Sequence, residues 1–480
     1  MIFFGFVLSC SIVAQSPEAS RANKFKLGDS PAEMRAAAVL ETVQSGDEVS
    51  IRKLINEQVV ADFRDAYPME QHISAFKRMH ENIGGAEVAA IMFSQPNSVD
   101  VTLKLSSGKY LKLSLQVAAE APHLITMMGF GPGEAPSGAK GPSASTFSFS
   151  SFDDLDAQLR QMTDADKFSG VVVATKNGQA QFQKAYGFAD RTRKISNQSD
   201  TLFDVGSINK QFTGVAVLKL AQEGRLNLDD PLGKFLKGFP PEIANRVTIR
   251  QLLQHRSGWG DYLDYPKFVE NPARFRTVND YLELIRTIPL EFEPGSKDRY
   301  SNIGFAVLGG VIEAVTGRSY FDVVSDVVYG PAGMKSTGSF ARGASGKNMA
   351  IGYTRLQSKG TASDQSAPLV SNSSLFPPSG SPAGGGYSNA EDLRLFVLAL
   401  LENRLLDKEH TALLLNRYSP PSGSAMRARW GFAGGAQGVS AVVLVDLVTR
   451  DTVVVLANLD MPVSEGIGDA IFRHLNQAVR

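Results

Sequence analysis

The stretch FDVGSINKQFT, residues 203–213, places a serine hydroxyl and a lysine amine three positions apart. Residues at i and i+3 share a helix face, so Ser207 and Lys210 are expected to be neighbours. A helix that begins at Ser207 also surrounds its hydroxyl with unpaired N–H groups and the positive end of the helix dipole. A lysine kept neutral by its surroundings can activate such a serine. The stretch therefore predicts a nucleophile, although this spacing also occurs on solvated helix faces.

The residues after Ser207 favour a buried helix. Apolar side chains recur there at near 3.6 spacing, at Ile208, Phe212, Val215, Leu218 and Ala221, and Glu223-Gly224 is typical of a glycine C-cap. A helix that carries its polar start into a core is a suitable place for a pocket nucleophile. An ordinary solvated N-cap serine is less expected there.

A second candidate element is EPGSKDRYSNIG, residues 293–304, followed by the apolar run 305–315. Pro294-Gly295 marks a turn, and the apolar run predicts a helix. Tyr300 and Asn302 are expected on a loop, pointing into one cleft. A phenol held between cations can act as a general base, and a side-chain amide can hold a substrate carbonyl and tune a nearby lysine. The alternative is a loop that merely caps the following helix.

Together, Ser207-x-x-Lys210 and Tyr300-x-Asn302 resemble the first two motifs of the serine β-lactamase and penicillin-binding-protein-like hydrolases, in particular the class C branch. Further segments resemble that family in the expected order: residues 226–232, 247–258, 330–338 and 381–388. The resemblance covers roughly residues 152–478. It implies an α+β fold of the β-lactamase/transpeptidase type, in which an antiparallel sheet is flanked by helices and accompanied by an all-helical region.

The resemblance also implies an acyl-enzyme mechanism. In that mechanism Ser207 attacks the substrate, Lys210 and Tyr300 move protons, and Asn302 orients the substrate. The backbone N–H of Ser207 supplies half of an oxyanion hole. The other half is expected from an edge strand that carries a third motif, usually Lys-Thr-Gly or His-x-Gly.

The counterpart of this third motif is WGFAGGAQGVS, residues 430–440, where Phe432 stands in place of the histidine or lysine. Gly434 and Gly435 can still offer a backbone N–H to the oxyanion, because that donor needs no side chain. Residues 418–429 leave little room for the strand and turn that usually precede the motif, so a deletion is expected there. We expect weak activity on carboxylate-bearing β-lactams and esterase-like activity on neutral acyl groups, with loss of catalysis as the alternative.

Other catalytic designs find little support in the sequence. It contains no G-x-S-x-G elbow, no H-E-x-x-H and no paired Cys/His ligand set, so neither a metal nor a cofactor is predicted. None of the six histidines suggests a catalytic triad; His255 is expected to be a packed, hydrogen-bonded residue. The adjacent carboxylates Asp153-Asp154 and Asp229-Asp230 favour capping or solvated roles.

Composition and the chain start give broader expectations. The chain has 480 residues, 43% of them hydrophobic, and balances 49 basic against 49 acidic residues, so nothing suggests a nucleic-acid partner. Residues 1–20 resemble a signal peptide, too short to span a bilayer comfortably, which predicts a periplasmic or secreted protein. Cys10 is the sole cysteine and offers a lipoprotein anchor as the alternative.

Residues 28–130 predict a separate small α+β domain. Helices are expected at 31–44 and 47–59, followed by strands at 87–93, 99–105, 110–117 and 123–128, in a cystatin-like or nuclear-transport-factor-like arrangement. Residues 131–150 have the Gly/Pro/Ser composition of a linker, and 151–480 form the predicted hydrolase domain. Within it we expect helices at 152–162 and 463–479 and hairpins at 170–187 and 441–457.

Three functional hypotheses follow from the sequence. The first is an exported serine hydrolase acting on esters or D-amino-acid amides. The second is a slowly acylated protein that binds β-lactams or peptidoglycan, and the third is a catalytically impaired scaffold. The expected partner is a small-molecule ester, amide or peptidoglycan-derived substrate, with no membrane span, and the sequence leaves the oligomeric state open.

Overall fold

The computed structural model describes residues 27–28, 30–65, 68–95, 98–118, 120–132, 147–344, 348–355, 367–418 and 429–477. The predicted signal peptide, Cys10, most of the predicted linker and residues 419–428 of the predicted deletion lie outside these ranges. The chain divides into two compact units, Met1–Thr146 and Phe147–Arg480. No described helix is both long and apolar enough to cross a membrane.

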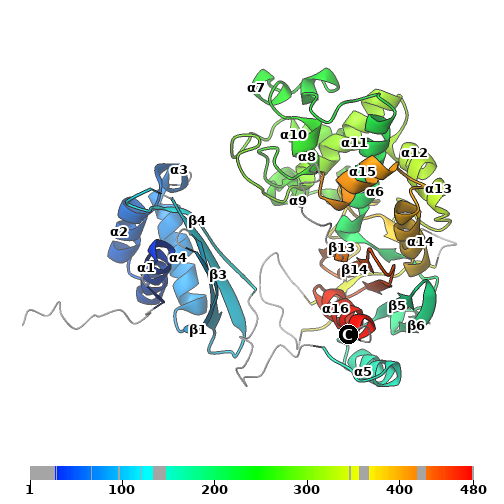
Figure 1. Ribbon diagram of the computed structural model, residues 1–480, viewed down its shortest axis with the longest axis horizontal. Coiled ribbons are helices and arrows are strands. Elements are labelled where there is room, and N and C mark those ends of the chain that lie inside the picture. Colours follow the sequence, from blue (N-terminus) through cyan, green and yellow to red (C-terminus); the bar gives the residue numbers. More distant parts are fainter. Residues whose placement is uncertain are drawn as a thin grey trace, which may run out of the picture. The chain divides into compact units, whose positions relative to one another are not determined.

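The first unit packs helices against one face of a four-stranded antiparallel sheet of order β1-β2-β3-β4 (Figure 1). The helices are α1 (Pro31–Ser45), α2 (Glu48–Gln58), α3 (Ala61–Arg64) and α4 (Met69–Ile83), and the strands are β1 (Glu87–Gln95), β2 (Ser98–Lys104), β3 (Tyr110–Val117) and β4 (Ile125–Pro132). Helix α1 begins with a capping box in which Ser30 and Glu33 bond each other's backbone. The cystatin-like or nuclear-transport-factor-like comparison stays a prediction.

Helices α3 and α4 were not predicted from the sequence. In α4 the residues Ile73, Phe76 and Ile83 are buried and lie on one face, because they are separated by three and seven positions. Charged and polar residues occupy most of the intervening positions, which hides this apolar stripe in the sequence.

The second unit is built on a five-stranded antiparallel sheet of order β13-β14-β15-β5-β6. Its strands are β5 (Gly170–Lys176), β6 (Gln179–Tyr186), β13 (Arg429–Ala436), β14 (Val439–Asp446) and β15 (Thr452–Ala457). Strands from the two ends of the unit meet where β15 pairs with β5, with Val454 opposite Val173. The predicted hairpins are present, and β13, which carries the third-motif counterpart, is an edge strand as expected.

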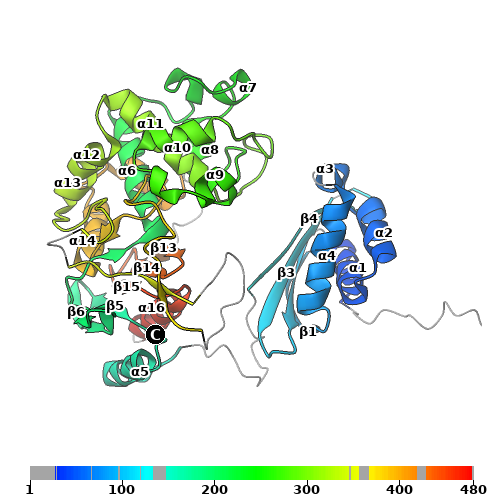
Figure 2. The same cartoon turned by 180° about the vertical axis from the view of Figure 1, so that it is seen from behind.

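Both faces of this sheet are covered, so its central strands β5, β14 and β15 are mostly apolar. Val172 and Ala174 face a cluster formed with α5 (Phe152–Asp164) and α16 (Val463–Gln477). Val171 and Val173 face the larger core of the helical region. Figure 2 shows α5 and α16 on one side of the sheet and the helical region on the other.

The helical region centres on α6 (Asn209–Gln222) and α11 (Asn302–Thr316). The other helices of the unit are α7 (Pro241–Ala244), α8 (Ile249–Leu253), α9 (Pro266–Val269), α10 (Val278–Ile285), α12 (Tyr320–Val324), α13 (Gly330–Ala332), α14 (Ala390–Leu401) and α15 (Lys408–Leu415). Short strands are β7 (Phe188–Asp190), β8 (Ile195–Ser196), β9 (Phe203–Asp204), β10 (Tyr353–Thr354), β11 (Val370–Ser371) and β12 (Tyr387–Ser388). Helix α6 is buried on nearly all sides, which agrees with its apolar composition.

Two predicted boundaries are wrong in an informative way. Ser207 does not begin the α-helix, because a 3-10 turn, η2 (Gly206–Ile208), precedes α6. Asn302 is not a loop residue, because the Ser301 side chain caps α11 and makes Asn302 its first residue. Both shifts place the polar side chain at the start of a buried helix.

Candidate active site

Ser207 lies in the η2 turn, which the preceding residues hold in an unusual backbone conformation. Gly206 has φ +50°, in the left-handed region, and its N–H donates to Asp204 Oδ1 at 2.8 Å. Arg342 in turn pairs with the other carboxylate oxygen of Asp204 at 2.8 Å. The turn presents the half-buried Ser207 side chain at the start of α6, where the first N–H groups of a helix have no intrahelical acceptor.

Lys210 is almost fully buried, with 3% of its surface exposed, and it contacts three oxygens. Its Nζ lies 2.6 Å from Asn302 Oδ1, 2.5 Å from the Ala383 carbonyl oxygen and 3.1 Å from Ser207 Oγ. Burial lowers the pKa of Lys210 to about 7, while the negative charge of Asp261 opposes this shift. A large fraction of the amine is therefore neutral at neutral pH.

A neutral amine has two N–H donors and one lone pair, and the three neighbours of Lys210 Nζ can pair with these three groups. Asn302 Oδ1 and the Ala383 carbonyl can only accept, so they take the two donors of Lys210. The third neighbour, the Ser207 hydroxyl, can donate its proton to the lone pair. The arrangement of Lys210 is that of a base directed at Ser207.

Tyr300 Oη lies 2.5 Å from Ser207 Oγ. Burial raises the pKa of Tyr300 to about 12, the hydrogen bond with Ser207 opposes this rise, and the charge of Asp261 adds to it. Since half of the Tyr300 side chain is exposed (51%), water moderates this rise. The expectation of a phenol that loses its proton between cations is therefore wrong: Tyr300 is protonated at neutral pH and can donate to Ser207 Oγ.

Asn302 is held at both ends of its amide. Its Oδ1 accepts from Lys210, and its Nδ2 donates to Asp261 Oδ2 at 2.6 Å. This geometry agrees with tuning of the lysine, and substrate binding by Asn302 stays a prediction. Asp261 was missed in the sequence, although it follows closely on the family-like segment 247–258.

His255 is packed and hydrogen-bonded, as predicted, but its neighbour is a predicted site residue. Its ring stacks on Tyr300, with centroids 4.7 Å apart and planes 28° apart, and its Nδ1 accepts the Ser301 N–H at 3.1 Å. Burial, together with the charge of Lys210, lowers the pKa of His255 to about 4, so the imidazole is neutral. His255 thus supports the short segment between Tyr300 and Asn302.

Strand β13 brings Gly434 and Gly435 against the η2 turn. A Cβ on Gly434 would lie 2.0 Å from the Val205 carbonyl oxygen and 2.8 Å from the Ser207 nitrogen. The Gly435 nitrogen lies beside Gly206, and Gly435 lines the same pocket as Ser207. Only glycine at position 434 permits this approach of the two backbones.

Phe432 does not reach the site. Its ring is buried in the core, where it packs against Trp430 at 4.8 Å and Phe396 at 6.1 Å between centroids. The strand that supplies a histidine or lysine in related motifs therefore supplies no charge to the pocket here.

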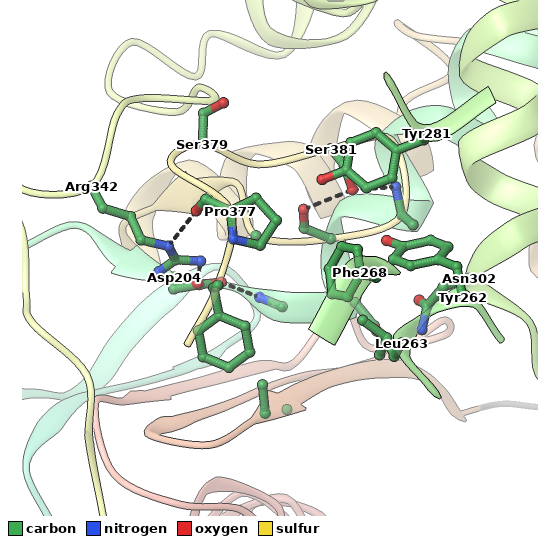
Figure 3. A pocket seen from close by; sticks show the side chains of 18 residues that line it. Asp204, Tyr262, Leu263, Phe268, Tyr281, Asn302, Arg342, Pro377, Ser379 and Ser381 are labelled. Carbon is green, nitrogen blue, oxygen red and sulfur yellow. Dashed lines mark hydrogen bonds and ion pairs between the residues drawn. The ribbon is translucent and has the colours of Figure 1, made fainter. Parts of the chain in front are cut away.

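The pocket beside Ser207 has a volume of about 110 Å³. Its lining has two parts, a polar part around Asp204 and Arg342 and an aromatic part formed by Tyr262, Phe268 and Tyr281 (Figure 3). Within the described residues, no three His, Cys, Asp or Glu side chains are grouped so that they could hold a metal ion.

Comparison with known proteins assigns the family. The Beta-lactamase family model matches residues 155–478, so the chain belongs to the β-lactamase and penicillin-binding-protein-like family. A penicillin-binding protein of Bacillus halodurans is 30% identical, with a TM-score of 0.58, covering 65% of this chain and 97% of that one. The fold of the second unit is therefore the predicted β-lactamase/transpeptidase-like fold.

Two further similarities concern activity. A D-stereospecific amidohydrolase from Streptomyces is 26% identical, with a TM-score of 0.53, over 66% of this chain and 97% of that one. Penicillin-binding protein 4* of Bacillus subtilis is 30% identical over 190 residues, which are 39% of this chain and 42% of the relative. The first curated relatives are matched over only 37% to 62% of their own lengths.

The contact between β13 and η2 generates a prediction. Gly434→Ala should force the strand away from Ser207 and displace the neighbouring Gly435 N–H. We expect the rate of Ser207 acylation to fall on the order of 10²- to 10³-fold, the usual effect of losing one oxyanion donor. The rate at which a fluorophosphonate labels Ser207 measures this fall. The control is Gly466→Ala in α16, where an added Cβ meets nothing within 4 Å; equal rates in both variants would contradict the prediction.

Proposed function

We propose that this protein is a serine hydrolase that works through an acyl-enzyme, with Ser207 as nucleophile and Lys210 as its base. The observation that carries the proposal is the set of partners around the Lys210 amine. Two acceptors, Asn302 Oδ1 and the Ala383 carbonyl, and the Ser207 hydroxyl lie within hydrogen-bond distance of Nζ, so in the neutral amine the lone pair is left for the Ser207 proton. Burial, which lowers the pKa of Lys210 to about 7, keeps that lone pair available.

The proposed acylation step transfers the Ser207 proton to Lys210 as Oγ bonds to the substrate carbonyl carbon. The N–H groups of Ser207 and Gly435 stabilise the oxyanion. When the bond to the leaving group breaks, Tyr300 donates a proton to that group and is reprotonated from Lys210. In deacylation a water molecule replaces the leaving group, and the same residues take its proton and return it to Ser207.

We propose esters or amides with an uncharged acyl group as substrates, and D-amino-acid amides, whose acyl group carries an ammonium, as the alternative. The similarity to the Streptomyces amidohydrolase supports the amide, and the burial of Phe432 away from the pocket supports an acyl group without a carboxylate. Slow acylation by β-lactams is the second candidate, supported by the matches to penicillin-binding proteins. Export, with Cys10 as an alternative lipid anchor, rests on the sequence of residues 1–20.

Covalent labelling tests the proposed nucleophile. A fluorophosphonate should add one label per chain, and Ser207→Ala should abolish it; intact-mass spectrometry reads both. Ser373→Ala, which removes an exposed serine, is the control and should label fully. A parallel penicillin arm separates ester chemistry from β-lactam binding. A folded wild-type protein that takes up neither reagent would contradict the proposal and favour the impaired scaffold.

The pH profile tests the base. Because only neutral Lys210 accepts the Ser207 proton, kcat/KM should rise about tenfold per pH unit below an inflection near 7 and level off above it. Asp261→Asn removes the charge that raises the lysine pKa, so its inflection should move to lower pH.

Tyr300→Phe provides the control for this profile. It should lower the plateau on the order of 10²- to 10⁴-fold, because a proton donor is lost, and keep the inflection near that of the wild type. A wild-type inflection near pH 10, or an inflection that vanishes in Tyr300→Phe, would show that Lys210 is not the base.

A further inference from the structure

The pocket beside Ser207 is bounded by a cluster of aromatic rings. Tyr262, Phe268 and Tyr281 line it and are only 3% to 5% exposed. The ring centroids of Tyr262 lie 4.9 Å from Phe268 and 5.3 Å from Tyr281, and Phe275 packs behind, 4.9 Å from Phe268. Figure 3 shows the rings of Tyr262, Phe268 and Tyr281 near Leu263 and Asn302.

Three separate elements hold this wall in place. Tyr262 lies on the 3-10 turn η4 (Tyr262–Asp264), Phe268 on α9 and Tyr281 on α10. Helix α10 is fixed at its start by a capping box between Thr277 and Asp280. Because the rings pack on one another and on the main core, the wall cannot recede without opening a void in that core.

The pocket also carries no uncompensated charge on its lining. Among the described residues that line it, the charged side chains are Asp204 and Arg342, and these pair at 2.8 Å with 10% and 12% of their side chains exposed. Arg342 also donates to the Pro377 carbonyl and the Tyr387 hydroxyl. A charged acyl group entering this space would lose its hydration without gaining a free counter-ion, which is costly.

The volume limits the size of the group. A space of about 110 Å³ is smaller than the roughly 150 Å³ cavity that admits benzene.

We propose that this pocket binds a short, uncharged, apolar acyl group and that Phe268 sets the limit on its length. The inference rests on the proposed function, because it assigns the acyl half of the substrate that Ser207 attacks. It favours esters of short aliphatic acids over substrates whose acyl group carries an ammonium or a carboxylate close to the carbonyl.

A series of p-nitrophenyl esters tests the proposal on the full chain. For the wild type, kcat/KM for the butyrate should exceed that for the octanoate by at least tenfold. It should also exceed by at least tenfold that for the hemisuccinate, an ester of equal length that carries a carboxylate. A wild type that hydrolyses the octanoate or the hemisuccinate as well as the butyrate would overturn the proposal.

Variants in the aromatic wall of the pocket test whether Phe268 limits the length of the acyl group. Phe268→Ala should raise the octanoate-to-butyrate ratio at least tenfold, and the milder Phe268→Leu should raise it less and remains informative if the alanine variant does not fold. The control Phe239→Ala removes a buried ring that packs against Trp259 and does not line the pocket, so its ratio should match the wild type. An unchanged ratio in a folded Phe268 variant would overturn the proposal.

Labelling of Ser207 by a small fluorophosphonate, run on the same samples, separates the two levels of inference. If Ser207 is fully labelled but kcat/KM is the same for all the esters, the acyl-group assignment is overturned and the proposed nucleophile stays in place. Absence of labelling in the folded wild type would overturn both.

Discussion

The site depends on a lysine amine that is buried inside a protein core and must spend much of its time uncharged. Removing Lys210 from water disfavours its protonated form, and the surrounding groups then determine where its donors and lone pair point. An acceptor from the start of α11 and a carbonyl from the segment before β12 take the N–H groups. The catalytic proposal, the expected pH dependence and the role of Asp261 all follow from this one environment.

The rest of the fold brings these acceptors together from distant parts of the chain. Asn302 and Ala383 lie 92 and 173 positions after Lys210, and their elements contact one another only because α6 is buried among them. Segment 381–383 is fixed along α6 by further bonds, in which Asn209 and Thr213 donate to the Ser381 and Pro382 carbonyls. Edge strand β13 closes the site from the sheet side through glycines that allow two backbones to touch.

The parts of the site that could be predicted from the sequence are the pairs of residues that lie only a few positions apart in the chain. Ser207 and Lys210 share a helix turn, and Tyr300 and Asn302 lie two positions apart, so their proximity could be expected. The buried sheet could be predicted because its central strands β5, β14 and β15 are mostly apolar, whereas α4 was missed because polar residues separate its buried ones.

Other features could not be predicted because they depend on contacts through space. Asp261 lies more than 40 positions from Asn302, and the stacking of His255 on Tyr300 spans a similar distance along the chain, so no local pattern marks either contact. The protonation of Tyr300 was predicted wrongly, because the sequence shows neither the burial of its hydroxyl nor the nearby negative charge of Asp261, which both raise its pKa. Likewise, the sequence shows that Phe432 occupies the position of the third-motif histidine or lysine, but only the structure shows that its ring is turned into the core.

The protonation of Lys210 can be measured directly by NMR. Lysines labelled with ¹³C at Cε can be titrated in the intact protein, and the resonance of Lys210 is identified by its absence in Lys210→Ala. We expect a pKa near 7 for this resonance, while the exposed lysines titrate near their ordinary value of about 10.4. A Lys210 resonance that titrates together with the exposed lysines would contradict the central claim that Ser207 is activated by a neutral, buried amine.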